Sequence, residues 1–202
     1  VIGIYENFDK NMFVRKVLKT NIEESNKTMP IFESVPFKLL REGYMSDRYN
    51  AIITLDFDVV NWQNSHKEVL YTSHGLIAYG KKHPLAKKRK VKASDFKNET
   101  FMHVSAIESP YAAIRTTKIC KSCGFAPKKV AEFPNLDSVF LALENGEGVA
   151  VCDKTIMPYN DSYIKLFELD DKEPQLIIVW KKKNETKKLL KIIELIKKAF
   201  AE

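Results

Sequence analysis

The pattern of apolar and polar positions predicts alternating strands and helices in the first third of the chain. The apolar run at residues 1–5 has the length of a strand buried in a sheet, and residues 29–35 and 51–55 are a second and a third candidate strand. Helical spacing appears between them, first over Phe13, Val14, Val17 and Leu18, and then over Leu39, Leu40 and Tyr44 after Pro36. Strand–helix–strand–helix–strand order predicts a parallel sheet with right-handed crossovers.

The clearest helix signal lies between residues 130 and 158. Asn135 or Asp137 can cap a helix by accepting N–H groups of its first turn. Gly146 can end that helix in a left-handed conformation, and residues 149–151 then form a short buried strand. The apolar side of the helix consists of Leu136, Val139, Phe140 and Leu143.

The rest of the chain follows the same alternation. An apolar stretch at 69–79 is broken at 72–75, and a strand is expected at 101–104. Ser109 followed by Pro110 predicts the start of a helix that runs to Gly124. Strands are expected at 163–169 and 175–180, and Asn184 is expected to cap the last helix.

Composition excludes some classes of protein. With 202 residues, 45% hydrophobic and 29% charged, the chain is globular rather than disordered, and its charge of +7 favours anionic ligands. Seven of residues 81–92 are basic, but they lack interleaved aromatics and Pro84 interrupts them, so a solvated loop is preferred to a nucleic-acid contact. No apolar run reaches 18 residues, and no signal peptide is evident. An odd count of three cysteines argues against a secreted disulfide framework, which predicts a reducing, cytoplasmic setting.

Candidate catalytic chemistry is missing from the sequence. There is no Gly-x-Ser-x-Gly elbow, phosphate-binding glycine loop or His-Glu-x-x-His, so we expect no enzymatic activity and no cofactor. Cys120 and Cys123 form a CxxC pair, but they fall in a helix's last turn, where the helix dipole disfavours a thiolate. Their spacing to other candidate ligands supports no metal site, so packing against the core is the favoured role.

Candidate ligand-binding residues follow from the rule that open α/β sheets bind ligands beyond the carboxyl ends of their strands. Helices that begin there direct N–H groups at the same crevice, where carboxylates bind. Ser105, near the helix start at Pro110, is expected to hydrogen-bond a carboxylate or amide. The alternative for the polar members is that they only cap helices. The predicted set is Asn7, Phe8, Val35, Thr54 and Leu55 in the first half, facing Ser105, Ala106, Tyr111 and Asn135 in the second.

Four short motifs occur in an order that is typical of one family: His83-Pro84-Leu85-Ala86, Asp95-Phe96, Gly124-Phe125-x-Pro127 and Asn145-Gly146-x-Gly148-Val149-Ala150. The chain thus resembles the effector-binding regulatory domain of LysR-type transcriptional regulators over nearly its whole length. One departure is Cys152-Asp153, where family members usually have a proline.

The resemblance implies an α/β fold of two Rossmann-like subdomains with a central cleft, similar to type 2 periplasmic binding proteins. The chain would cross near Ser73 and Pro174, which gives subdomain I as 1–72 with 174–202 and subdomain II as 73–173. A small effector would bind in the cleft, and a homodimer is implied. Operator DNA would be bound only through a winged helix-turn-helix ahead of Val1, outside these residues. The alternatives are a free-standing solute-binding receptor or an enzyme of the same fold.

Overall fold

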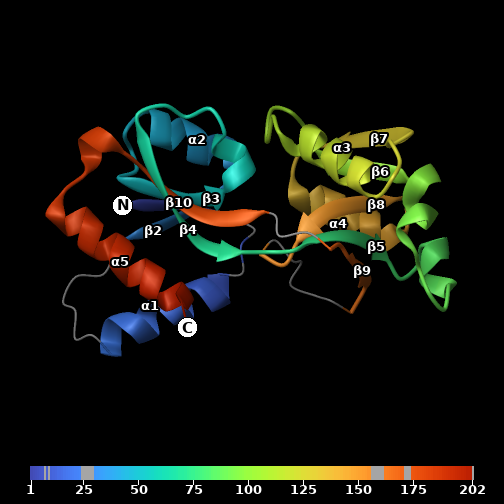
Figure 1. Cartoon of the computed structure of the whole chain (residues 1–202), viewed down its shortest axis with the longest axis horizontal. Helices are drawn as coiled ribbons and strands as arrows, with labels where there is room; N and C mark the ends of the chain where they lie inside the picture. Colours follow the sequence, from blue (N-terminus) through green and yellow to red (C-terminus); the bar gives the residue numbers. More distant parts are fainter. Residues whose placement is uncertain (7, 9, 24–29, 156–161, 171–173, 202) are drawn as a thin grey trace. The chain divides into compact units, whose positions relative to one another are not determined.

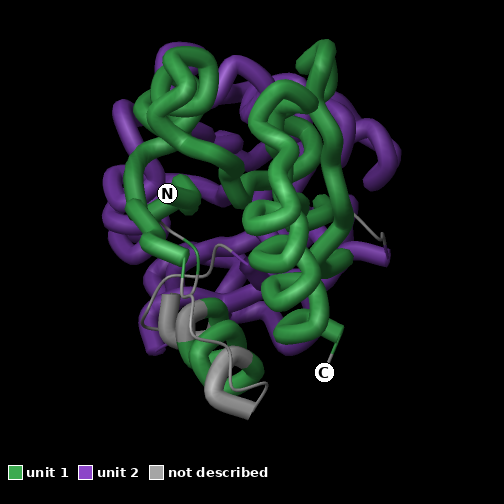
Figure 2. Tube along the Cα trace, turned by 90° about the vertical axis from the view of Figure 1, so that its left-hand side faces the viewer, with its two compact units in different colours: residues 1–73, 174–202 green, residues 74–173 purple. Residues whose placement is uncertain are grey.

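The chain folds into two compact units. The computed structural model describes residues 1–6, 8, 10–23, 30–155, 162–170 and 174–201. Residues 1–73 and 174–202 make up unit 1, and residues 74–173 make up unit 2, so the chain passes twice between them (Figure 2). Among the described residues, no helix has the length and apolar character that a membrane span requires.

Unit 1 is built on a mixed five-stranded sheet in the order β2-β1-β3-β10-β4. β1 pairs in parallel with β2 and β3, which confirms the predicted β-α-β-α-β arrangement. β10 returns from the end of the chain and pairs antiparallel with both β3 and β4. The strands are β1 (Ile2–Tyr5), β2 (Phe32–Val35), β3 (Ala51–Leu55), β4 (Ser65–Thr72) and β10 (Gln175–Lys181).

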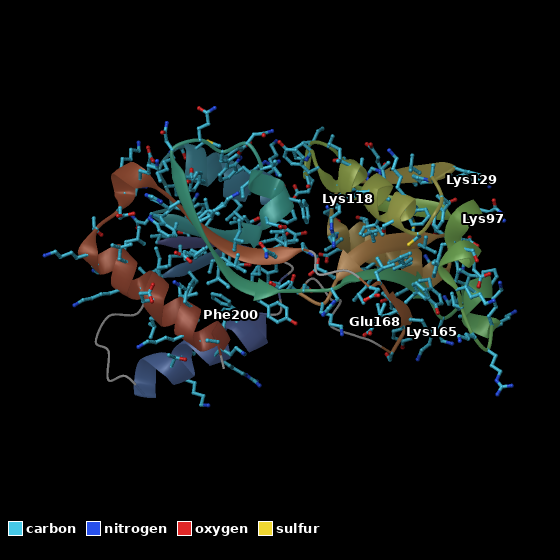
Figure 3. All side chains as sticks on the ribbon, in the orientation of Figure 1. Lys97, Lys118, Lys129, Lys165, Glu168 and Phe200 are labelled. Carbon is cyan, nitrogen blue, oxygen red and sulfur yellow. The ribbon has the colours of Figure 1, made fainter. Side chains whose placement is uncertain are left out.

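Helices cover both faces of this sheet. α2 (Phe37–Met45) lies on one face, where the Tyr5 ring stacks on Phe37 with ring centroids 3.6 Å apart. α1 (Lys10–Glu23) and α5 (Lys187–Ala201) lie on the other face (Figure 1). Phe13 of α1 contacts Phe200 of α5, which is labelled in Figure 3, with ring centroids 5.3 Å apart.

Unit 2 has a second mixed sheet in the order β7-β6-β8-β5-β9. Alternate residues of β5 pack into two different hydrophobic cores, one on each face of the sheet. Leu76 and Ala78 pack with α4, whereas Ile77 and Tyr79 pack with two short 3₁₀ helices and the end of α3. The elements are β5 (Gly75–Gly80), η2 (Pro84–Lys87), η3 (Ala93–Asn98), β6 (Thr100–Val104), α3 (Ala112–Ser122), β7 (Lys129–Phe133), α4 (Leu136–Asn145), β8 (Val149–Asp153) and β9 (Ile164–Glu168).

Two of the sequence motifs meet at the end of β5. His83 caps η2, because its Nδ1 accepts the Leu85 N–H at 3.2 Å, which leaves Nε2 to donate to Glu99 at 3.2 Å. Gly146 ends α4 with φ +82°, and a Cβ there would lie 3.1 Å from the His83 nitrogen. The glycine motif therefore allows α4 to end directly against the loop that His83 fixes.

Some element boundaries differ from the prediction. α3 begins at Ala112 rather than Pro110, because the Ser105 carbonyl first accepts the Glu108 and Ser109 N–H groups in a turn. α5 begins at Lys187, where the Thr186 hydroxyl accepts the Leu189 N–H at 3.1 Å, so Asn184 is not its cap. Strand β7 was not predicted at all.

Candidate functional site

In unit 1, the three parallel strands end at the same edge of the sheet. Tyr5 of β1 is in register with Val35 of β2, and Ile4 is in register with Ile53 of β3. The predicted residues Val35 and Leu55 are therefore the last residues of β2 and β3, the two strands that flank β1. Phe8 lies just past β1, buried, with its ring edge-on to Tyr5 at 5.5 Å between centroids.

Thr54 is the most informative residue of this edge. It is only 1% exposed, and within the described part of the chain its Oγ1 has no hydrogen-bond partner. The strand register sets Thr54 beside Tyr5, so both side chains lie on the face that α2 covers. α2 begins at this corner after Pro36, which supplies no side-chain cap. A buried hydroxyl and a helix N-terminus thus lie on the same face and at the same edge of the unit 1 sheet.

A buried ion pair adjoins the same edge. Asp58, in the 3₁₀ turn η1 (Asp56–Val59) directly after β3, is 1% exposed. Its Oδ1 lies 3.7 Å from a guanidinium nitrogen of Arg41 on α2. Separating this pair would leave the buried Asp58 carboxylate without its counter-charge, which costs free energy. The ion pair therefore holds Arg41 in a fixed position relative to the end of β3.

In unit 2, the corresponding edge is formed by β6, β7 and β8. Ser105 follows β6 and donates its N–H to the Phe133 carbonyl of β7 at 2.8 Å. Ala106 is exposed in the turn that follows, and Tyr111 is the N-cap residue of α3, which receives no side-chain cap. Asn135 caps α4, as predicted, because its Oδ1 accepts the Ser138 N–H at 2.9 Å. Its amide oxygen is therefore already engaged.

A second buried ion pair, which the sequence did not predict, lies at this edge. Asp153 ends β8 and is fully buried. Its Oδ2 lies 3.7 Å from Arg115 of α3, which also donates to the Cys152 carbonyl at 3.3 Å. Thr155 donates both its N–H, at 2.9 Å, and its hydroxyl to the Asp153 Oδ1. The signal that could have found it was the departure from the family pattern at Cys152-Asp153.

The predicted residues thus form two groups, one in each unit. Phe8, Val35, Thr54 and Leu55 gather at the edge of unit 1, and Ser105, Ala106, Tyr111 and Asn135 lie along the edge of unit 2. Asn7 lies outside the described residues.

Cys120 and Cys152 lack the environment of a reactive thiol. Burial raises the pKa of both Cys120 and Cys152 to about 12, so neither is a thiolate near neutral pH. The three cysteines are free thiols, and the described residues contain no group of three metal-ligating side chains. Cys120 belongs to the core around Phe96 and Phe101, as its spacing predicted.

The basic stretch 81–92 is held to unit 2 at a few points and is otherwise mostly exposed. Lys88 pairs with Asp95 at 2.8 Å. Lys165 of β9, labelled in Figure 3, donates to the Ala86 carbonyl at 2.8 Å. The stretch includes the η2 turn between two core elements, and its exposed lysines agree with the preferred interpretation as a solvated loop.

Comparison with known proteins supports the resemblance to LysR-type regulatory domains. The family model of the LysR substrate binding domain matches residues 39–201. The effector-binding domain of a BenM variant is 17% identical, with TM-score 0.75 over 99% of this chain and 93% of that chain. The effector-binding domain of QuiR in complex with shikimate is 13% identical, with TM-score 0.76 over 99% of this chain and 95% of that chain.

A third similar structure is HinK, a LysR family transcriptional regulator from Pseudomonas aeruginosa. It is 13% identical, with TM-score 0.75 over 100% of this chain and 69% of that chain. A comparison with curated proteins found no match. The family match identifies a regulatory domain, and the two mixed five-stranded sheets are the fold of the similar structures. The chain belongs to the LysR substrate-binding family and is the effector-binding domain of a LysR-type transcriptional regulator.

Proposed function

We propose that the chain senses a small metabolite that contacts the carboxyl-end edges of both sheets. Units 1 and 2 then serve as regulatory subdomains I and II. The observation that carries the proposal is the Thr54 hydroxyl, buried at the edge of unit 1 without a hydrogen-bond partner among the described residues. A buried polar group is normally paired, so a ligand group is a natural partner for this hydroxyl.

The chemistry of the two edges favours an effector that carries a carboxylate. In unit 1, Thr54 lies on the face that α2 covers, at the edge of the sheet where α2 begins, and the dipole of that helix attracts negative charge at its N-terminus. In unit 2, Ser105 lies in the turn that leads into α3. Two similar domains are described as complexes with shikimate and with benzoate, which are both carboxylates. We therefore propose a small organic acid as the effector of this chain.

The proposed mechanism is a shift between states rather than a reaction. The effector binds one arrangement of the two units better than another, and so raises the population of that arrangement. In the regulator, this shift acts on a DNA-binding module that reads the operator. Because the target is DNA, we propose the cytoplasm as the site of action.

Binding of small organic acids, followed by calorimetry, tests the proposal. Thr54→Val and Ser105→Ala should each weaken binding of the same acid by about ten- to a hundredfold, the usual effect of losing one hydrogen bond to a charged group. Ser122→Ala, at the opposite end of α3, should bind normally, since its hydroxyl donates locally to the Ile119 carbonyl of the same helix. Binding that is unchanged in both edge variants would contradict the proposed site.

We also propose that the chain forms a homodimer, in which the α1–β2 surface of unit 1 meets the α3–β7 surface of the partner's unit 2. Most of the side chains on the predicted apolar sides of α1 and α4 are buried inside the units: Phe13, Val17, Val139, Phe140 and Leu143. Four apolar side chains are exposed on the proposed surfaces: Leu18 of α1, Ile31 directly before edge strand β2, Ile114 of α3 and Val130 of edge strand β7.

Sedimentation at micromolar concentration tests the dimer, which should bury at least about 1,000 Å². Val130→Asp on edge strand β7 should shift the protein to monomer, because a charge would be buried in the interface. Leu39→Asp, on the exposed side of α2, serves as the control and should leave the mass unchanged. A monomer at every concentration for the unaltered protein would refute the dimer and leave the effector proposal intact.

A further inference from the structure

Unit 1 contains a pocket of about 660 Å³ at the edge of its sheet opposite to Thr54. β10 pairs antiparallel with β3, so its last residue, Lys181, lies at the edge where the parallel strands begin. Thr54 is in register with Ile177, four residues earlier on β10, which is roughly 13 Å along the strand. The pocket is therefore separate from the proposed effector site.

Two aromatic rings form one wall of the pocket. Tyr44, in the last turn of α2, is buried and donates its hydroxyl to Ser65 at 2.7 Å. Trp62 stacks on it, with ring centroids 4.6 Å apart and planes inclined by 24°. Tyr44 thus holds the indole in place, and partly exposed Trp62 lines the pocket. A fixed indole is a platform on which a planar ring can stack.

Lysines also line the pocket, and the Lys181 ammonium lies over the Tyr44 ring at 5.3 Å from its centroid. Lys181 and Lys183 both donate to Asp47, at 2.7 and 2.6 Å, so a single carboxylate is shared by two ammonium groups. Lys182 is exposed between them and also lines the pocket. Three lysines against one aspartate leave a net charge of +2 at the pocket. Such a charge attracts an anion.

The backbone around the pocket is held in an uncommon conformation. The two non-glycine residues with positive φ in the described part of the chain are Asp47, at 62°, and Asn64, at 56°. Both flank this pocket, and the Asn64 carbonyl accepts the Lys182 N–H at 3.0 Å. Asn61 and Asn64 add amide groups that can hydrogen-bond the edge of a ring.

We infer that this pocket is a second small-molecule site, for a planar ring that carries a negative charge. The ring would stack on Trp62, and its anionic group would contact Lys182. A volume of about 660 Å³ falls within the range of small-molecule sites. A nucleotide and an aromatic carboxylate share this chemistry. The inference is independent of the proposed effector site.

The indole N–H signals in a proton–nitrogen correlation spectrum test the inference directly. The chain has two tryptophans, Trp62 and Trp180, and the indole N–H of buried Trp180 is donated to Glu185 at 3.1 Å. Trp62→Phe assigns the two signals. The probes are adenosine 5′-monophosphate and indole-3-carboxylate, compared with the uncharged adenosine and indole-3-carboxamide and with inorganic phosphate.

We expect at least one planar anion to move the Trp62 signal saturably, with its uncharged counterpart about fivefold weaker or more. Which of the two anions binds more tightly distinguishes a nucleotide from an aromatic acid. Lys182→Met should weaken the anion about two- to fivefold without unfolding the protein, because this side chain is exposed. Thr54→Val should leave the titration unchanged.

Several results would overturn the inference. The inference is wrong if neither planar anion moves the Trp62 signal saturably, or if charged and uncharged rings bind with equal affinity. It is also wrong if phosphate alone has the same effect, or if Lys182→Met keeps full affinity for the anion. A titration that Thr54→Val abolishes would show that the signal reports on the effector edge instead.

Discussion

Replacing Thr54 by valine should make the ligand-free protein more stable. The Thr54 side chain is 1% exposed, and its hydroxyl has no hydrogen-bond partner in the described part of the chain. Burying an unsatisfied hydroxyl costs about 1–3 kcal/mol. Valine has nearly the same shape and the same preference for a strand, so it removes this cost and keeps the packing. We expect the free energy of unfolding to rise by about 1 kcal/mol or more.

Urea unfolding measures this difference, and thermal unfolding should show an increase in Tm of roughly 2–4 °C per kcal/mol for a chain of this size. Thr155→Val is the matched control, because Thr155 is also buried but its hydroxyl donates to Asp153. Removing that donor should lower the free energy of unfolding by about 1–2 kcal/mol. The two variants make the same chemical change with opposite expected signs.

A loss of stability in Thr54→Val comparable with that in Thr155→Val would refute the reasoning. It would mean that the Thr54 hydroxyl already has a hydrogen-bond partner in the ligand-free protein and is therefore not available to an effector. The complementary measurement is the gain in Tm on adding the effector, which should be smaller in Thr54→Val because the variant binds less tightly.

Three further predictions rest on individual contacts. Gly80→Ala should destabilise the protein by about 2 kcal/mol or more in urea, because the new Cβ would lie 1.9 Å from the Leu143 carbonyl oxygen; an unchanged midpoint would contradict that packing. Cys120 and Cys152 should resist a thiol reagent at pH 8 until urea is added, since burial raises the pKa of both thiols to about 12; prompt labelling of the folded protein would count against it. The Asp47 carboxyl should titrate near pH 2 by NMR, because hydrogen bonds from two lysines lower its pKa from 3.8. Its contribution to stability is then present above about pH 4 and is lost as the pH falls towards 2. A titration midpoint near pH 4 would show that the lysines do not hold this carboxylate.

Elements with a strong apolar signature could be predicted from the sequence, and weakly patterned ones could not. β1 and β3 are buried along their whole length and were found as apolar runs. β7 is an edge strand in which Lys129, Val130 and Glu132 are exposed, so its sequence carries no clean alternation. Its position is determined by pairing with β6, a tertiary contact that periodicity does not encode.

The start of α3 shows a similar limit. Ser109 followed by Pro110 is a sound local signal for a helix start. In the folded chain, however, the Ser105 carbonyl accepts two N–H groups and forms a turn first, and the helix begins at Ala112. Local capping chemistry identified the right region, while the exact first residue depended on how the chain leaves β6.

The rule that ligands bind beyond strand carboxyl ends pointed to Thr54 and Ser105 but not to the ion pairs beside them. Arg41 and Asp58 come from different elements, and so do Arg115 and Asp153, so that only the folded topology brings each pair together. Local sequence patterns that identify a strand end do not reveal which distant arginine will lie over it.

These two ion pairs are hard to explain as devices for stability. A buried ion pair loses about as much in desolvation as it gains in attraction, and apolar residues of the same size often serve equally well. Yet in each unit an arginine on a helix lies 3.7 Å from a buried aspartate at the end of a strand, at the carboxyl-end edge of the sheet. What such a pair supplies is a guanidinium fixed in position. A guanidinium held at each edge by its aspartate can donate its remaining N–H groups to an anion, so each pair places a positioned donor where the effector is proposed to bind.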